Sequence, residues 1–391
     1  MSRFLFVVPP LIGHVNPAAT LARELYGRGH RVAWAGRAET LRPLLGRDAE
    51  IHDTADPALD AALADSRERW LGLRGAGALK FLWAEFIVPL ARASLPGVEA
   101  AVDAVAPDVI VVDQQAVAGA LTARRRGLPW ATSATTSAEL TQPYAAMPKV
   151  EEWVREQMAQ LCRDAGIEPS DLRFSDDLVL AFTAAALIGP GERFPGHYAF
   201  VGPALGARPD STDFPWHALD PARRRVLVSL GTVNGDAGER FFTAMARAAE
   251  PLDVQLIVAG PPELLPDPPP AVLIRPYLPQ LELLPHVDAV VCHAGHNTVC
   301  EALAHGLPLV VAPIRDDQPI IAGQVAAAGA GVRVRFARDG ADQLRTALHA
   351  VLTDPAYRDA ARRVQASFTA AGGAPAAADR LESLTMTVVP S

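Results

Sequence analysis

Short apolar runs alternate with longer amphipathic, Ala-rich stretches along the whole 391-residue chain. This alternation predicts parallel strands joined by crossover helices, which makes the fold class α/β. In the first half the expected strands are FLFVVP from Phe4, RVAWAG from Arg31, VIVVD from Val109, PWATSA from Pro129 and the region near Tyr198. In the second half they are RVLVSLG from Arg225, VQLIVAG from Val254, VLIRPY from Val272, DAVVCH from Asp288 and PLVVAP from Pro308.

A segment without periodicity separates the two halves. Residues 206–222 are rich in Pro, Gly and Asp, which is typical of a linker. We therefore expect a Rossmann-like domain over residues 1–205, completed by a C-terminal helix over 373–391, and a second Rossmann-like domain over 223–372. Ligands of open α/β sheets bind outside the carboxyl ends of the strands, so two such domains would face an interdomain cleft.

Composition narrows the possible functions. Apolar residues make up 50% of the chain and charged residues 20%, which is enough for two substantial cores. The net charge of -8 gives no general attraction for nucleic acid or an anionic membrane. No segment has roughly 18 uninterrupted apolar residues, so we expect a soluble protein without an integral membrane segment. The three cysteines, Cys162, Cys292 and Cys300, are widely spaced, which favours a reducing cytoplasm over a disulfide framework or metal cluster.

The stretch from Tyr277 to Gln318 contains the strongest candidate binding site. The turn after the expected strand DAVVCH contains His293, Gly295, Asn297 and Thr298. A helix N-terminus with free backbone N–H groups binds an anion, and glycine lets the backbone approach a phosphate closely. Glu301 follows about one helical turn later and can bind ribose hydroxyls. Thr298 and Glu301 also fit a capping box, so this motif alone is compatible with a helix cap as well.

A helix cap does not require the other polar residues of this stretch. From Tyr277 to Gln318 the chain resembles the sugar-nucleotide signature of the UDP-glycosyltransferase superfamily: aromatic-x-P-Q, then H-x-G-x-N-[ST]-x-x-E, then D-Q. The resemblance implies that the aromatic residue stacks on the nucleobase, the His and the Asn-Thr turn hold the diphosphate, the Glu binds ribose and the D-Q pair binds sugar hydroxyls. The implied donor-binding residues are Tyr277, Gln280, His293, Gly295, Asn297, Thr298, Glu301, Asp317 and Gln318.

Two positions depart from the pattern of the superfamily. Many members have Trp where this chain has Tyr277, although tyrosine still offers a stacking face. Plant members have Trp where this chain has His296, which is more typical of bacterial members, and the role of His296 stays open. The resemblance covers nearly the whole chain and is weakest over residues 50–100 and 135–200.

A second phosphate-binding element is expected after RVLVSLG. Gly231, Thr232 and Gly235 lie in the sequence GTVNGDAG ahead of a helical stretch. Glycine-rich turns after strands free backbone N–H groups for anions, and the Thr232 hydroxyl can donate one more hydrogen bond. A simple turn without a ligand is the alternative, but the resembled superfamily has a Gly-Ser/Thr here that meets the diphosphate.

Candidate catalytic residues follow two strands of the first half. His14 lies in PPLIGHVNP, before a helix that Asn16 can cap and Pro17 can begin. An imidazole can take a proton from a hydroxyl near neutral pH. Asp113 ends VIVVD, where a buried carboxylate could fix the tautomer of the imidazole. A turn histidine and a helix N-cap are the alternatives, but G-H-x-x-P with this Asp resembles the catalytic dyad of the same superfamily.

The regions of weakest resemblance are where an acceptor pocket is expected. The candidate apolar and aromatic residues are Trp70, Phe81, Leu82, Trp83, Phe86, Ile87 and Met147. Aromatic residues at helical spacing also pack in cores, so a core role is the alternative for each of them. A pocket of this kind would accept a hydrophobic aglycone in preference to a simple sugar.

Together these features predict an inverting, metal-independent glycosyltransferase of the GT-B fold, acting in the cytoplasm as a monomer or homodimer. Its co-substrate would be a nucleoside-diphosphate sugar, with UDP favoured over TDP and a hexose such as glucose as the sugar. No cofactor and no metal are expected, and the acceptor would be a small hydrophobic natural product. The alternatives are a sugar-nucleotide epimerase of similar two-domain fold and a sugar-nucleotide-binding protein without catalysis.

Overall fold

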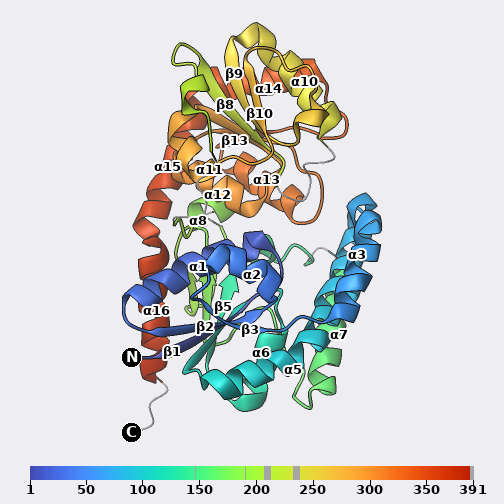
Figure 1. Ribbon diagram of the computed structural model, residues 1–391, viewed down its shortest axis with the longest axis vertical. Coiled ribbons are helices and arrows are strands. Elements are labelled where there is room, and N and C mark those ends of the chain that lie inside the picture. Colours follow the sequence, from blue (N-terminus) through green and yellow to red (C-terminus); the bar gives the residue numbers. More distant parts are fainter. Residues whose placement is uncertain (146, 190, 207–212, 232–237, 388–391) are drawn as a thin grey trace. The chain divides into compact units, whose positions relative to one another are not determined.

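The structure is a computed structural model, and it describes residues 1–145, 147–189, 191–206, 213–231 and 238–387. Two compact units make up the chain (Figure 1). Unit 1 comprises Met1–Thr183, Arg193–Pro209 and Ala371–Ser391, and unit 2 comprises Ala184–Glu192 and Asp210–Ala370. The C-terminal segment therefore belongs to unit 1. Ala184–Glu192, which the sequence analysis assigned to the first domain, groups with unit 2.

Unit 1 is built on a parallel seven-stranded sheet of order β3-β2-β1-β4-β5-β6-β7. Its strands are β1 (Arg3–Val7), β2 (Arg31–Gly36), β3 (Glu50–Asp53), β4 (Val109–Asp113), β5 (Trp130–Ala134), β6 (Leu178–Ala181) and β7 (Tyr198–Phe200). The five strands expected from the pattern are present, and two more, β3 and β6, were not expected. EIHD of β3 is too polar to stand out as an apolar run, because β3 lies at the edge of the sheet.

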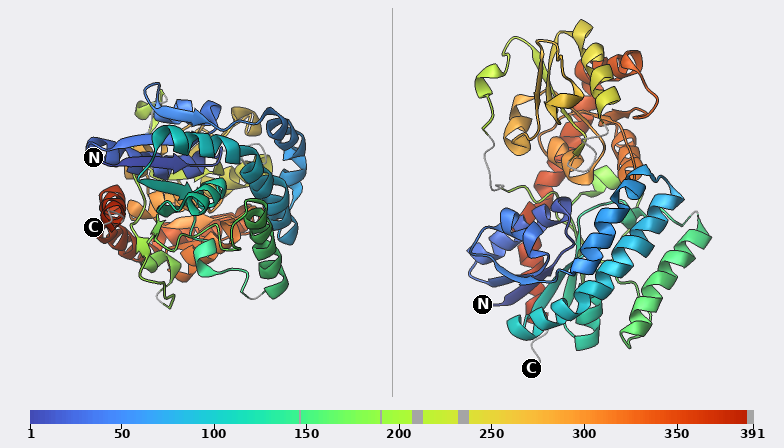
Figure 2. Two further views of the ribbon diagram at one scale, coloured as in Figure 1. Left: turned by 90° about the horizontal axis from the view of Figure 1, so that it is seen from below. Right: turned by 45° about the vertical axis from the view of Figure 1, so that its right-hand side comes forward.

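Helices cover both faces of the unit 1 sheet (Figures 1 and 2). They are α1 (Ile12–Gly27), α2 (Ala38–Leu45), α3 (Pro57–Gly72), α4 (Ala76–Phe81), the π-helical turn η1 (Leu82–Ile87), α5 (Val88–Val105), α6 (Ala118–Arg126), the 3-10 turn η2 (Glu139–Thr141), α7 (Pro148–Asp164) and α16 (Gly373–Thr387). Successive residues of β1 enter different cores: Phe4 and Phe6 pack with α1 and α16, whereas Leu5 and Val7 pack with α5 and α6. The strand is therefore buried on both faces, as parallel sheets require.

One helical stretch of the described residues, Ala76–Val105, is long and apolar enough by length and composition to cross a membrane. Val88, Ala91, Val98 and Val102 of this stretch belong to the same core cluster as Leu5 and Val7. A core helix passes the same test of length and composition, so this stretch is weak evidence for a membrane span.

Unit 2 repeats the architecture with a parallel six-stranded sheet of order β10-β9-β8-β11-β12-β13. Its strands are β8 (Arg224–Ser229), β9 (Val254–Ala259), β10 (Val272–Arg275), β11 (Ala289–Cys292), β12 (Leu309–Val311) and β13 (Gly331–Arg333). Its helices and 3-10 turns are α8 (Ala185–Ile188), η3 (Trp216–Ala218), α10 (Glu239–Ala249), η5 (Glu250–Leu252), η6 (Pro262–Leu264), α11 (Gln280–Leu283), η7 (Leu284–His286), α12 (His296–Ala304), α13 (Gln318–Ala327), α14 (Ala341–Thr353) and α15 (Pro355–Ala371). The short edge strand β13 was not expected from the pattern.

Strand order places one switch point in each sheet. Chain connections leave β1 and β4 in opposite directions in unit 1, and they leave β8 and β11 in opposite directions in unit 2. Ligands of doubly wound sheets bind at such switch points, outside the carboxyl ends of the strands. The predicted catalytic residues follow β1 and β4, and predicted donor-binding residues follow β8 and β11.

Candidate active site

His14 and Asp113 lie together at the switch point of unit 1. The ring Nδ1 of His14 is 3.0 Å from both carboxylate oxygens of Asp113. The Asp113 side chain has no exposed surface, whereas 17% of the His14 side chain is exposed. A buried carboxylate bonded to Nδ1 favours the tautomer that carries a proton on Nδ1, which makes Nε2 the basic nitrogen. This geometry is suited to general base catalysis.

The local structure around this pair corrects the expected start of one helix and excludes the alternative role of Asp113. Helix α1 begins at Ile12, not at Pro17, so His14 lies in its first turn and Pro17 lies inside the helix. Asp113 is not the N-cap of the next helix, because α6 begins at Ala118 after Val117. Instead, the Gln115 backbone N–H donates to Asp113 Oδ1 at 2.9 Å. The carboxylate therefore organises the strand end itself, and the alternative of a helix cap is wrong.

Thr135 is a third member of this site that the sequence analysis did not identify. It follows β5, and its Oγ1 lies 2.8 Å from His14 Nδ1 and 2.9 Å from Asp113 Oδ2. The available signal was the expected strand PWATSA, which places Thr135 directly beyond a strand end. The pairing of β5 with β4, which brings the two strand ends together, is a tertiary feature.

In unit 2, the predicted phosphate-binding residues lie in the turn after β11 and in the first turn of α12. Helix α12 begins at His296 with Gly295 as its N-cap, so Asn297 and Thr298 belong to the first turn of the helix. The capping-box alternative for Thr298 and Glu301 is therefore wrong. Glu301 is buried, and its Oε2 accepts a hydrogen bond of 2.6 Å from Gln280 Nε2. The first turn of α12 offers backbone N–H groups and the positive end of a helix dipole.

His293 fills the space that two glycines leave beside it. A Cβ atom on Gly231 would come within 2.7 Å of the His293 ring, and one on Gly295 within 2.3 Å. The pKa of His293 is lowered to about 4, chiefly because the ring is buried and to a smaller extent by the charge of Arg315. The Ser229 backbone and the charge of Asp317 act in the opposite direction. The imidazole is therefore neutral at neutral pH, and it can exchange hydrogen bonds with a ligand but adds no positive charge.

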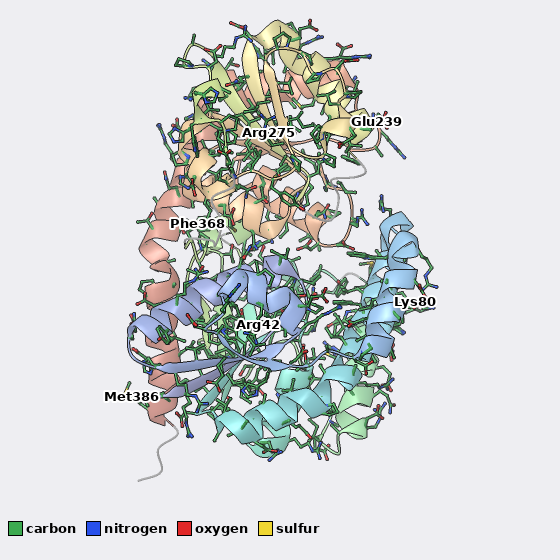
Figure 3. All side chains as sticks on the ribbon, in the orientation of Figure 1. Arg42, Lys80, Glu239, Arg275, Phe368 and Met386 are labelled. Atoms are coloured by element: carbon green, nitrogen blue, oxygen red, sulfur yellow. The ribbon has the colours of Figure 1, made fainter. Side chains whose placement is uncertain are left out.

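The remaining donor-site predictions lie at the same carboxyl edge of the unit 2 sheet. Tyr277 follows β10, and 73% of its surface is exposed. The last residue of β10, Arg275, is labelled in Figure 3. Asp317 is the N-cap of α13, which begins at Gln318. The Gln318 side-chain carbonyl accepts hydrogen bonds from the backbone N–H groups of Ile314 and Arg315, so this residue also organises the loop before α13. Thr232 and Gly235 lie outside the described residues.

Buried Arg315 is a second residue that the sequence analysis missed. It lies in the loop between β12 and α13, and its charge acts on His293. The available signal was a basic residue directly before Asp316-Asp317. Among the residues that the structure describes, no three His, Cys, Asp or Glu side chains form a group that could hold a metal ion.

The predicted acceptor residues are dispersed within unit 1. Trp83 has no exposed surface and belongs to the core, where Phe86 packs against the same cluster. Trp70 and Phe81 stack on each other with ring centroids 6.3 Å apart. Met147 is exposed. For Trp83 this burial supports the alternative of a core role, because a side chain that is enclosed by the core offers no surface to a ligand.

A cavity lies elsewhere in unit 1, at the carboxyl ends of β1, β2 and β3. Its lining includes Val8, Pro10, Arg37, Thr54, Leu59 and Ala116. None of the seven predicted acceptor residues lines this cavity. Pro10 belongs to the loop that leads to His14, and the Ala116 N–H donates to the Asp113 carbonyl. The cavity therefore adjoins the loop that precedes His14 in the chain and the loop that follows Asp113.

Comparison with known proteins agrees with this arrangement. Residues 206–367 match the family model described as UDP-glucoronosyl and UDP-glucosyl transferase. The chain is 30% identical to 4'-demethylrebeccamycin synthase of Lentzea aerocolonigenes, over 98% of this chain and 99% of that protein. It is 29% identical to demethyllactenocin mycarosyltransferase of Streptomyces fradiae, over 98% of this chain and 87% of that protein. The crystal structure of the calicheamicin glycosyltransferase CalG4 is similar with a TM-score of 0.81 and 25% identity, and the similarity covers 100% of both chains.

Proposed function

Because the chain belongs to the UDP-glucoronosyl and UDP-glucosyl transferase family, we propose that it moves a sugar from a nucleoside diphosphate to a hydroxyl of a small hydrophobic natural product. The single observation that carries the proposed mechanism is the contact of 3.0 Å between His14 Nδ1 and Asp113. A sugar-nucleotide-binding protein without catalysis needs no such base.

In the proposed reaction His14 Nε2 takes the proton of the acceptor hydroxyl while the hydroxyl oxygen attacks the anomeric carbon of the donor. The bond between that carbon and the diphosphate oxygen breaks, and the diphosphate leaves with the bonding electron pair. Attack from the side opposite the leaving group inverts the anomeric centre. Asp113 stabilises the imidazolium that forms.

The charge of the leaving diphosphate would be met in unit 2. The first turn of α12 supplies backbone N–H groups, and the helix dipole adds a partial positive charge at this end. Arg315 is a cation at the same edge of the sheet, and neutral His293 adds hydrogen-bonding capacity. These groups support a reaction in which the protein itself stabilises the leaving group, without a metal ion.

Donor and acceptor preferences are proposed from the same residues. Glu301 can accept hydrogen bonds from both ribose hydroxyls of UDP, whereas the deoxyribose of TDP lacks one of them. Asp317 and the Gln318 amide would bind hydroxyls of a hexose such as glucose. The cavity of unit 1 is lined mainly by aliphatic side chains, so we propose that the hydrophobic part of an acceptor binds at this edge of the sheet. Demethyllactenocin and calicheamicin in the names of related proteins support a natural-product acceptor.

The test is a transfer assay with the full chain, UDP- and TDP-glucose and a panel of hydroxylated aglycones, read by mass spectrometry of the products. We expect His14→Ala to lower the transfer rate by about 10²- to 10⁴-fold, because it removes the general base. His349→Ala, which changes an exposed histidine on α14, is the matched control and should keep the wild-type rate.

Three results would contradict parts of this proposal. A folded His14→Ala protein with a near-wild-type rate would show that another group is the base. An epimerised sugar nucleotide formed without acceptor would favour the epimerase alternative. Loss of activity in EDTA that a divalent cation restores would contradict metal-independent transfer.

A further inference from the structure

Thr135 contacts both members of the proposed catalytic pair. It follows β5, whose Ser133 pairs with Asp113 of β4, and this pairing brings the two strand ends together. The Thr135 hydroxyl oxygen is 2.8 Å from His14 Nδ1 and 2.9 Å from Asp113 Oδ2, and Thr135 is buried. The strands β1, β4 and β5 are neighbours in the sheet. His14 follows β1, Asp113 ends β4 and Thr135 follows β5, so their side chains share one hydrogen-bonded cluster.

The protons of this cluster can be assigned from its charges. An unprotonated Nδ1 would direct its lone pair at two carboxylate oxygens 3.0 Å away, which is repulsive. Nδ1 therefore carries a proton and donates it toward Asp113. The Thr135 hydroxyl then donates to Asp113 Oδ2 and turns a lone pair toward the Nδ1–H group of His14.

We propose that Thr135 is a positioning residue of the transfer reaction, and that its hydroxyl stabilises the imidazolium form of His14. The negative end of the hydroxyl dipole faces the ring, so it favours a positive charge there. Thr135 and the Gln115 N–H also hold the Asp113 carboxylate from opposite oxygens, which fixes its orientation toward His14. This inference rests on the proposed function, because Thr135 has this task only if His14 is the base.

Three of the charged side chains around α1 pair with residues other than His14. The charged side chains on the helices packed against α1 are Glu39 and Arg42 of α2 and Asp379, Arg380 and Glu382 of α16. Asp379 and Glu382 bind Arg28, one residue beyond the C-terminal end of α1. Glu39 binds Arg37 after β2. The charged group that directly contacts His14 and Thr135 together is therefore Asp113.

The test compares pH profiles of kcat for wild type, Thr135→Val and Thr135→Ser. Valine preserves the shape of threonine but lacks the hydroxyl. We expect Thr135→Val to lower the plateau of kcat by about tenfold, since hydrogen bonds to charged groups are the stronger ones. We also expect the midpoint of the acid limb to move to lower pH by up to about one unit, because the imidazolium loses a stabilising partner. Thr135→Ser should restore both values, and the control Thr369→Val on α15 should change neither.

An unchanged midpoint in Thr135→Val would overturn the inference whatever the rate, because a merely structural role lowers the amount of active protein without moving the midpoint. A second measurement does not need activity: the titration of His14 can be followed in ¹⁵N-histidine-labelled protein and assigned by its absence in His14→Ala. If His14→Ala keeps its transfer rate, His14 is not the general base and the proposed mechanism is wrong. If His14→Ala is inactive but the His14 titration is the same in wild type and Thr135→Val, only the role of Thr135 fails.

Discussion

At the residue scale, the environment of His293 decides what kind of phosphate ligand it can be. The two neighbouring glycines, Gly231 and Gly295, let the ring pack where any Cβ atom would collide with it. Burial of this ring lowers the pKa of His293 to about 4. In our proposal the diphosphate is therefore bound by a neutral imidazole, and positive charge comes from Arg315 and the α12 dipole.

This burial predicts a pH dependence of stability. The pKa of His293 is lower in the folded chain than the ordinary value of 6.5, so between about pH 6.5 and 4 the unfolded chain binds a proton that the folded chain does not. The free energy of unfolding then falls as the pH falls through this window. We expect the contribution of His293 to fall by about 2 kcal/mol between about pH 7 and about pH 5.

Urea unfolding of wild type and His293→Gln at both pH values measures this contribution. On acidification the free energy of unfolding of the variant should fall by about 2 kcal/mol less than that of wild type. His349→Gln, which changes an exposed histidine, should behave as wild type does. Equal losses in wild type and His293→Gln would contradict the prediction.

At the element scale, α16 completes unit 1 although it is the last helix of the chain. Figures 1 and 2 show this helix in red beside α1, and the two helices are in contact. Leu381 of α16 has no exposed surface and lies in the same core as Phe4, Phe6 and Val111. Through this core α16 packs against β1, which precedes His14 in the chain, and against β4, which ends at Asp113.

Apolar contacts stabilise the packing of α16 in unit 1 more than its ion pairs do. Arg28 binds Asp379 and Glu382, but Asp379 is 68% exposed, and exposed ion pairs contribute about 0–1 kcal/mol. Removing a buried leucine side chain costs about 2–5 kcal/mol. The buried face of α16 therefore contributes more to the free energy of unfolding than its ion pairs do.

We predict that Leu381→Ala lowers the free energy of unfolding by about 2–5 kcal/mol, as measured by urea unfolding followed by circular dichroism. Asp379→Ala should lower it by less than about 1 kcal/mol. Met386→Ala is the control on the same helix, because Met386 is 70% exposed and lies near the helix end (Figure 3). A larger effect of Asp379→Ala than of Leu381→Ala would contradict this ranking.

At the scale of the whole molecule, each unit has cores of its own and its own set of candidate residues. Among the described residues, clusters of buried apolar side chains lie in unit 1 and in unit 2. The proposed base and acceptor cavity belong to unit 1, and the proposed donor residues belong to unit 2. This division predicts that each substrate slows hydrogen exchange in a different part of the chain.

Hydrogen–deuterium exchange in the presence of UDP alone tests whether the donor binds to unit 2. We expect slower exchange in residues 293–301 and 314–320 of unit 2, because bound phosphate and ribose cover the first turn of α12 and the loop before α13. Peptides that contain residues 8–16 and 113–116 should keep the exchange rates of the free protein. Protection by UDP that is confined to unit 1 would contradict the assignment of the donor site.

The amino-acid sequence determined the class of fold and the donor signature. Alternating apolar runs are sufficient to indicate parallel strands, because strands that are buried on both faces must be apolar throughout. The spacing from Tyr277 to Gln318 carried the family resemblance, because those residues are close together in the chain. The sequence could also place His14 shortly after one strand and Asp113 at the end of another.

The tertiary structure decided which residues meet and which are buried. Thr135 joins the pair only because β5 lies beside β4, and no local pattern reports that pairing. The same holds for Gln280 and Glu301, which are 21 residues apart in the chain but form a hydrogen bond. The start of α12 at His296 excludes the capping box that the spacing of Thr298 and Glu301 allowed. Trp83 reads as a pocket residue in the sequence but is enclosed by the core. Burial and long-range pairing depend on the packing of distant segments, so the sequence pattern alone could not determine them.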